Sequence, residues 1–202
     1  SILSEKPEKD IEGDLSEAVE DRLIIPLSSN IFTFSHDRIQ QGAYGLITDD
    51  NRSAGHLRAG RLLLAAIPEA KREENLFTIL DQFNKGKDLI TSAEERESVA
   101  KLNHQAGLKA KESAAFAPAY QFFRTGLDLL SEDSWQSRYE FTLAIHNDAA
   151  EAAYLSGDHE GMERLGEIIL KNARNTTDKV PFYISRINSR SSQGRFREAL
   201  DA

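Results

Sequence analysis

The sequence predicts a mainly α-helical protein, in which a short β-hairpin unit is followed by a series of helical hairpins. The first observation is that apolar residues beyond position 50 recur every three or four residues, the spacing of amphipathic helices. The second is a pair of β-type runs near the N-terminus, joined by a short polar turn. The third is a set of similar turns, built around small residues, between the later helices. Together these features favour helices stacked on helices over a sheet-based fold.

The N-terminal region is predicted to contain a short helix followed by a β-hairpin. Residues 1–14 are polar and acid-rich, and we expect them to form a flexible N-terminal segment. The stretch from Leu15 to Leu23 has the apolar spacing of a short amphipathic helix. The two β-type runs follow at 23–27 and 31–34, and Pro26 indicates that the first is an edge strand.

A further helix is predicted directly after this hairpin. The β-type alternation breaks at Ser35-His36-Asp37, and the apolar residues that follow lie on one helical face. Ser35 or Asp37 is expected to cap this helix by accepting a hydrogen bond from a first-turn N–H group. Helix, hairpin and closing helix make up the C-terminal part of a winged-helix domain, which we place at residues 15–50.

Helices are predicted for most of the remaining chain. Two capping boxes, Ser92 with Glu95 and Asp133 with Gln136, indicate helix starts. Gly157 is a candidate for the left-handed residue that closes a helix. The predicted helices cover 53–67, 73–90, a segment after Ser92, a segment that begins near Pro118, and a segment from Asp133 to Gly157.

Three of the turns between helices resemble one another, each with a small residue followed by a ring two positions later. They begin at Ala114, Gly157 and Gly194. The offsets are 43 residues (114 to 157) and 37 residues (157 to 194), compared with about 34 in tetratricopeptide repeats. We therefore interpret residues 51–202 as a tetratricopeptide-like helical-hairpin solenoid, and we expect the chain to be a fragment that breaks off within a repeat.

Composition excludes several classes of function. The chain has 25 Lys and Arg against 33 Asp and Glu, a net charge of −8 that repels phosphate backbones, so we expect no nucleic-acid partner. It has no cysteine, which excludes disulfides, thiolate metal sites and cysteine nucleophiles. The longest apolar run, Leu62 to Ile67, is far shorter than the roughly 20 residues of a membrane helix. We expect no membrane contact and a cytoplasmic location.

No set of residues predicts catalysis or metal binding, and one histidine is a candidate for anion binding. The five histidines lack the i, i+4 spacing of a helical zinc site, and we interpret His104 and His146 as hydrogen-bonded structural residues. His36 lies between a strand end and a helix start, where free N–H groups and the helix dipole favour an anion. A neutral imidazole there can donate to a phosphate while Asp37 holds the turn. The alternative is that His36 only bridges the hairpin to the helix.

The same residues carry a resemblance to a known family. The stretch FTFSHDRIQQGAYGLI, followed by HLRAGRLLL and NLFTILDQFNKGKDLI, resembles the segment just after the ATPase module in large bacterial signalling proteins. Those hybrids combine a serine/threonine kinase, an AAA-like signal-transduction ATPase, helical repeats and often a sensor histidine kinase. In the wider class of such ATPases, the winged helix carries a Met-His-Asp-like motif whose histidine reaches the β-phosphate of ADP. Ser35-His36-Asp37 matches that motif, so the resemblance implies that His36 senses the nucleotide state and that Asp37 supports it.

The resemblance also implies where nucleotide would bind and what the chain would do. ATP or ADP and Mg²⁺ are expected only in an upstream domain of the parent, a possible protein kinase and ATPase, and no cofactor is expected in this chain. We interpret the chain as a non-catalytic regulatory fragment whose repeats bind protein, either another domain of the same chain or a signalling partner. The alternative is a free-standing helical-repeat scaffold without a nucleotide link. A DNA-reading winged helix ranks third, because the segment before Leu23 is acidic.

Overall fold

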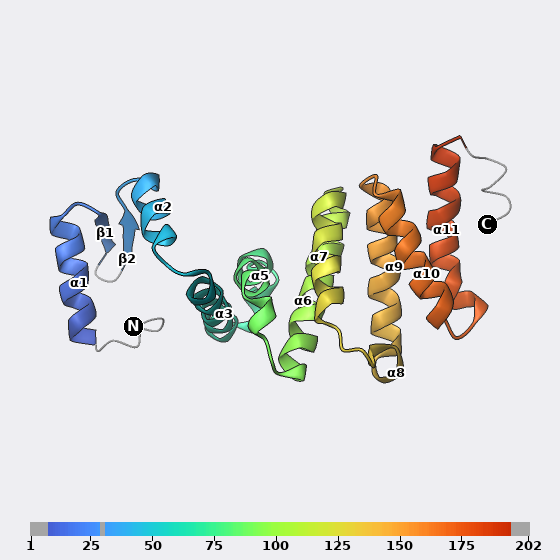
Figure 1. Ribbon diagram of the computed structural model, residues 1–202, viewed down its shortest axis with the longest axis horizontal. Coiled ribbons are helices and arrows are strands. Elements are labelled where there is room, and N and C mark those ends of the chain that lie inside the picture. The colour runs from blue at the N-terminus through green and yellow to red at the C-terminus, as the bar shows by residue number, and fades with distance from the viewer. Residues whose placement is uncertain (1–7, 29–30, 195–202) are drawn as a thin grey trace. The chain divides into compact units, whose positions relative to one another are not determined.

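The computed structural model describes residues 8–28 and 31–194, which are mainly helical with one two-stranded antiparallel sheet (Figure 1). The mainly helical fold class predicted from the sequence is confirmed, as is the β-hairpin near the N-terminus. The chain divides into two compact units. The first contains the described residues through Arg72 together with Asp81–Leu89, and the second contains Glu73–Leu80 and the described residues from Ile90 onward. The boundary placed between residues 50 and 51 stays a prediction.

The first unit begins with a helix and the β-hairpin. Helix α1 (Glu8–Glu20) starts seven residues before the predicted Leu15. It closes with Arg22 in the left-handed region (φ 58°) and with the Leu23 amide donating to the Ala18 carbonyl, a Schellman-type end. Strands β1 (Ile24–Ser28) and β2 (Ile31–Phe34) pair antiparallel, with Ile24 opposite Phe34. Residues 29 and 30 of the predicted turn lie outside the described residues.

The rest of the first unit is helical, and one predicted helix is interrupted. Helices α2 (Asp37–Gly45), α3 (Asp49–Ala66) and α4 (Glu69–Arg72) belong to this unit, as does a short 3-10 helix, η1 (Lys87–Leu89). Helix α5 (Leu76–Lys85) is divided between the units, because its residues through Leu80 belong to the second unit and the rest to the first. The helix predicted over 73–90 therefore ends at Gly86. A Cβ atom at this glycine would lie 2.6 Å from the Ser53 carbonyl oxygen and 2.8 Å from the Leu57 amide nitrogen. The backbone of α3 packs so closely here that only glycine fits.

The second unit is a row of packed helices (Figure 1). Helix α7 packs against both α6 and α9, and α9 packs in turn against α10 and α11. The core of this unit combines small and aromatic side chains, such as Ala119, Phe123 and Phe182, with aliphatic ones such as Ile145 and Ile169, all of them buried. The helices are α6 (Ala93–Glu112), α7 (Phe116–Leu129), α8 (Ser134–Ser137), α9 (Tyr139–Leu155), α10 (His159–Asn172) and α11 (Thr176–Ser192).

The two predicted capping boxes have different outcomes. At the start of α6, the Ser92 hydroxyl accepts a hydrogen bond from the Glu95 amide (3.3 Å), as predicted. At Asp133 no side-chain cap forms, and the predicted continuous helix is split into α8 and α9 at Arg138. The capping box at Asp133 was therefore a wrong prediction.

The three similar turns share one backbone conformation. Ala114, Gly157 and Gly194 all lie in the left-handed region, with φ of 54°, 89° and 73°. The next helix begins two residues later in the first two cases, at Phe116 and His159. The rest of the third turn lies outside the described residues. The left-handed cap predicted at Gly157 is confirmed, whereas the tetratricopeptide-like assignment stays a prediction.

Candidate functional site

The predicted site residue His36 lies at the junction between β2 and α2. It is the N-cap residue of α2, with an extended backbone (φ −149°, ψ 145°), and its carbonyl oxygen accepts hydrogen bonds from the Ile39 amide (3.0 Å) and the Gln40 amide (3.2 Å). Its imidazole is exposed and does not cap the helix. The strand–histidine–helix order predicted from the sequence is therefore present in the structure.

The predicted side-chain cap of α2 is absent, because Ser35 has other partners. The Ser35 hydroxyl donates to the Arg22 carbonyl (2.6 Å) and lies 3.2 Å from the Leu23 carbonyl. Asp37 is the first residue of α2, where its negative charge complements the positive end of the helix dipole, but it makes no capping hydrogen bond. Ser35 thus ties the start of α2 back to the end of α1 and the start of β1.

The groups at this junction include several that can bind an anion. His36, Asp37 and Arg38 line a surface hollow together with Phe34 and Ile39. The Ile39 amide donates to the His36 carbonyl, whereas the amides of Asp37 and Arg38 have no carbonyl four residues earlier in the helix and can donate to a bound group. An imidazole, a guanidinium and backbone amides therefore face the same hollow, with one carboxylate among them. The assignment of His36 and Asp37 to nucleotide sensing stays a prediction.

The segment that carries His36 contributes little to a hydrophobic core. Among residues 13–27 and 32–49, whose side chains the structure describes, none is buried. Several large apolar side chains are exposed, including Ile25 on β1, Phe34 on β2 and Leu46 after α2. Exposed apolar side chains at this density are typical of a surface that contacts another protein or domain.

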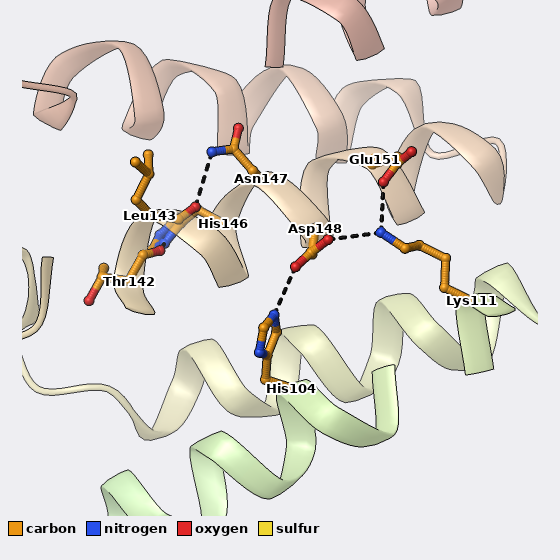
Figure 2. A network of polar contacts seen from close by, with 8 residues as sticks. All are labelled: His104, Lys111, Thr142, Leu143, His146, Asn147, Asp148 and Glu151. Atoms are coloured by element: carbon orange, nitrogen blue, oxygen red, sulfur yellow. Dashed lines mark hydrogen bonds and ion pairs between the residues drawn. The ribbon is translucent and has the colours of Figure 1, made fainter. Parts of the chain in front are cut away.

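A second polar cluster, not predicted from the sequence, links α6 to α9 in the second unit (Figure 2). Asp148 is its centre: one carboxylate oxygen lies 2.8 Å from His104 Nε2, and the other accepts a hydrogen bond from Lys111 Nζ at 2.8 Å. Lys111 also donates to Glu151 (2.8 Å). The His104 ring packs against Phe123 and Phe141, with ring centroids 5.6 and 5.5 Å apart. Four charged or titratable side chains from two helices are thus joined.

The hydrogen bonds within this cluster favour the charged forms of Asp148 and Lys111. Burial raises the pKa of Asp148, but the hydrogen bonds from His104 and Lys111 outweigh burial, and the pKa of the carboxyl is lowered. Burial lowers the pKa of Lys111, but its two carboxylate partners outweigh burial and raise the pKa of the ammonium. Asp148 and Lys111 are therefore both charged at neutral pH. These partly buried ion pairs hold α6 to α9.

The prediction that His104 and His146 are hydrogen-bonded is confirmed by their contacts. His146 Nδ1 lies 2.7 Å from the Thr142 carbonyl oxygen, and its ring lies 4.8 Å from that of Trp135. Burial lowers the pKa of His146, although the hydrogen bond to Thr142 opposes this shift. Within the part of the chain that the structure describes, no group of three or more His, Asp or Glu side chains is arranged to hold a metal ion.

None of the described helices combines the length and apolar character that crossing a membrane requires. No protein-family model matches the chain, and no solved structure matches it.

One curated protein does show similarity. The chain is 28% identical, over 194 aligned residues, to "Hybrid signal transduction histidine kinase G" from Dictyostelium discoideum. The alignment covers 84% of this chain but only 6% of that protein. The chain is thus similar to a short part of a much longer signalling protein, and this similarity supports a signalling context for it.

Proposed function

We propose that this chain is a non-catalytic regulatory segment of a larger signalling protein, in which the helical hairpins bind protein. The observation that carries this proposal is the similarity itself, because most of the chain aligns with a small fraction of a hybrid histidine kinase. A segment of this kind acts by positioning other parts of the protein. The finer assignment, a winged-helix tail followed by tetratricopeptide-like repeats behind an ATPase module, belongs to the same proposal.

The exposed apolar side chains near the N-terminus support a coupling role for residues 15–50. Ile25, Leu27 and Leu46 are exposed on the hairpin and after α2. Leaving them in water is unfavourable by about 25 cal/mol for each Å² of apolar surface. A neighbouring domain that covers them would gain this free energy and would be held next to His36. The proposed neighbour is the upstream ATPase module.

The role proposed for His36 is to sense the state of a nucleotide bound to that module. The imidazole would donate a hydrogen bond to the β-phosphate of ADP, and Asp37 would hold the first turn of α2 in place. ATP or ADP and Mg²⁺ would belong to the upstream module. Because one hydrogen bond to a charged group contributes about 1.5–3 kcal/mol, losing it would weaken ADP binding about ten- to a hundredfold.

Calorimetry of ADP binding tests this role, on the longer protein that carries the upstream region. The variants are His36→Leu and, as a matched control, Gln40→Leu, which introduces the same side chain at an exposed position of the same helix. We expect His36→Leu to weaken ADP binding at least about tenfold and Gln40→Leu to leave it within about twofold. Equal affinities for all three proteins, or no binding by any, would show that His36 is only a structural junction.

The alternative function is that of a free-standing helical-repeat scaffold without a nucleotide link. It shares the protein-binding hairpins and differs in requiring no upstream module. The intact mass of the native protein separates the two, because the scaffold predicts a mass close to the 22.6 kDa of these 202 residues. A much larger mass would favour the regulatory segment.

A further inference from the structure

Helix α2, which begins directly after His36, is held in the first unit with little help from burial. It packs against β2, but none of its residues is buried. The helices that follow are joined differently. A Cβ atom at Gly60 of α3 would lie 3.0 Å from Cδ2 of Phe83, a side chain of α5 that is only 1% exposed. Polar contacts therefore carry most of the attachment of α2 to α3.

A chain of three side chains makes this attachment. The Tyr44 hydroxyl of α2 lies 2.7 Å from Nε2 of His56 in α3. Nδ1 of the same imidazole lies 2.8 Å from Oε1 of Gln82, in the part of α5 that belongs to the first unit. The imidazole of His56 is thus bonded at both nitrogens, to one helix on each side in the sequence.

The partners of Gln82 fix the direction of these hydrogen bonds. Gln82 Nε2 donates to Oδ2 of Asp81 (2.9 Å), which leaves Oε1 as the acceptor that faces His56. His56 Nδ1 must therefore carry the hydrogen, and Nε2 of the neutral imidazole has a free lone pair. The Tyr44 hydroxyl consequently donates to His56. Lys85 Nζ donates to the same Asp81 oxygen (2.8 Å) and holds that carboxylate in place.

Arg52 bridges the same joint from the α3 side. Its guanidinium carbon lies 4.7 Å from the centre of the Tyr44 ring, within the range of a cation–π contact. Its Nη2 donates to the Ile47 carbonyl (2.8 Å), in the short connection between α2 and α3. Leu46 in this connection is 87% exposed, so the connection itself is not packed into a core.

We propose that Tyr44, His56 and Gln82 form a latch that fixes α2 against α3, and that α2 moves about residues 46–48 when the Tyr44 hydroxyl leaves His56. Because His36 is the N-cap residue of α2, the latch determines where His36 lies relative to the helices that follow. The latch does not depend on the nucleotide link proposed for His36.

Tyr44→Phe is the decisive variant, because it removes the hydroxyl and keeps the ring next to Arg52. Hydrogen–deuterium exchange with rapid mixing measures the effect on the amides of residues 40–46, and the amides of residues 57–66 in α3 provide the internal reference. Losing one hydrogen bond of ordinary strength should raise exchange in α2 about two- to tenfold and leave α3 unchanged. Tyr183→Phe, the same change on α11 in the second unit, should not alter exchange in α2.

A second variant separates the latch from a general effect of the hydroxyl. In a chain that carries His56→Leu, adding Tyr44→Phe should produce no further increase, because the partner of the hydroxyl is already absent. Unchanged exchange in α2 for Tyr44→Phe alone would overturn the proposal. An equal increase in α2 and α3 would also overturn it, since Tyr44 would then stabilise the whole unit and not the joint.

Nitrogen-15 NMR of the neutral His56 imidazole tests the order of the bonds independently. We expect the hydrogen on Nδ1 in the unmodified chain, as the orientation of Gln82 requires. A hydrogen on Nε2 would show that Tyr44 does not donate to His56 and would overturn the latch.

Discussion

The close contact between α10 and α11 in the second unit gives a quantitative prediction for Gly166→Ala. Gly166 lies in α10, and a Cβ atom built on it would be 1.9 Å from Cζ of Phe182 and 2.1 Å from Cε2 of the same ring. Carbon atoms that are not bonded prefer separations of about 3.5–4.0 Å. The ring of Phe182 would therefore have to retreat by more than about 1 Å, roughly the shortfall in that separation. The Phe182 side chain is only 1% exposed, so other residues surround the ring and would have to shift with it.

The expected size of the effect follows from two opposing contributions. Overpacking a filled core costs about 1–3 kcal/mol, and a shortfall of this size belongs at the upper end. Replacing glycine by alanine inside a helix raises the unfolding free energy by about 1 kcal/mol, because alanine has the higher helix propensity. The net loss of unfolding free energy is therefore about 2 kcal/mol. Phe182→Leu, which shortens the side chain that Gly166 faces, should recover about 1–2 kcal/mol of this loss in the double variant.

Urea unfolding, followed by circular dichroism and by the fluorescence of the single tryptophan, Trp135, measures these free energies. Gly55→Ala is the control, because Gly55 lies inside α3 and a Cβ there would meet no atom within 4 Å. This control should gain about 0.5–1 kcal/mol. If Gly166→Ala were as stabilising as Gly55→Ala, the close packing of Phe182 on Gly166 would be refuted.

Two other predictions concern a turn and a buried histidine. Ala114→Gly should stabilise the protein by about 0.5–1 kcal/mol in the same urea assay, because Ala114 is held at φ 54°, where a side chain is unfavourable. A loss of stability would contradict this prediction. Burial lowers the pKa of His146 below its unfolded value of 6.5, so the unfolded chain binds a proton that the folded chain does not. The unfolding free energy should therefore fall as the pH decreases below about 6.5. His146→Gln should flatten that dependence between about pH 7 and 5, and an unchanged slope would mean that another group is responsible.

Local patterns were sufficient to predict the elements that neighbouring residues determine. The β-hairpin, the strand–His36–helix order and the start of α6 at Ser92 all depend on residues within a few positions of one another. The interruption at Gly86 was not predictable in this way, because it arises from the backbone of α3 near Ser53 and Leu57, far earlier in the sequence. Apolar periodicity continues through such a break and gives no sign of it.

The same distinction applies to the candidate sites. His36 was identified from its place between two adjacent elements, and the structure puts it at that junction. The pair of His104 and Asp148 was not predicted, because 44 residues separate them and neither has a distinctive neighbour in the sequence. Only the packing of α6, α7 and α9 brings these side chains together. A single sequence carries no signal for that pairing.

The link between His104, Lys111 and Asp148 has a mechanical consequence for the row of helices. In a linear array, each helix usually depends on its immediate neighbours, so bending is resisted by contacts between consecutive helices. In this protein, His104 and Lys111 of α6 bond directly to Asp148 of α9, although α7 and α8 lie between these two helices in the chain. Opening the array between them would stretch charge-assisted hydrogen bonds, which weaken steeply with distance. We therefore expect these bonds to resist separation of α6 from α9, in addition to the packing of each helix against α7.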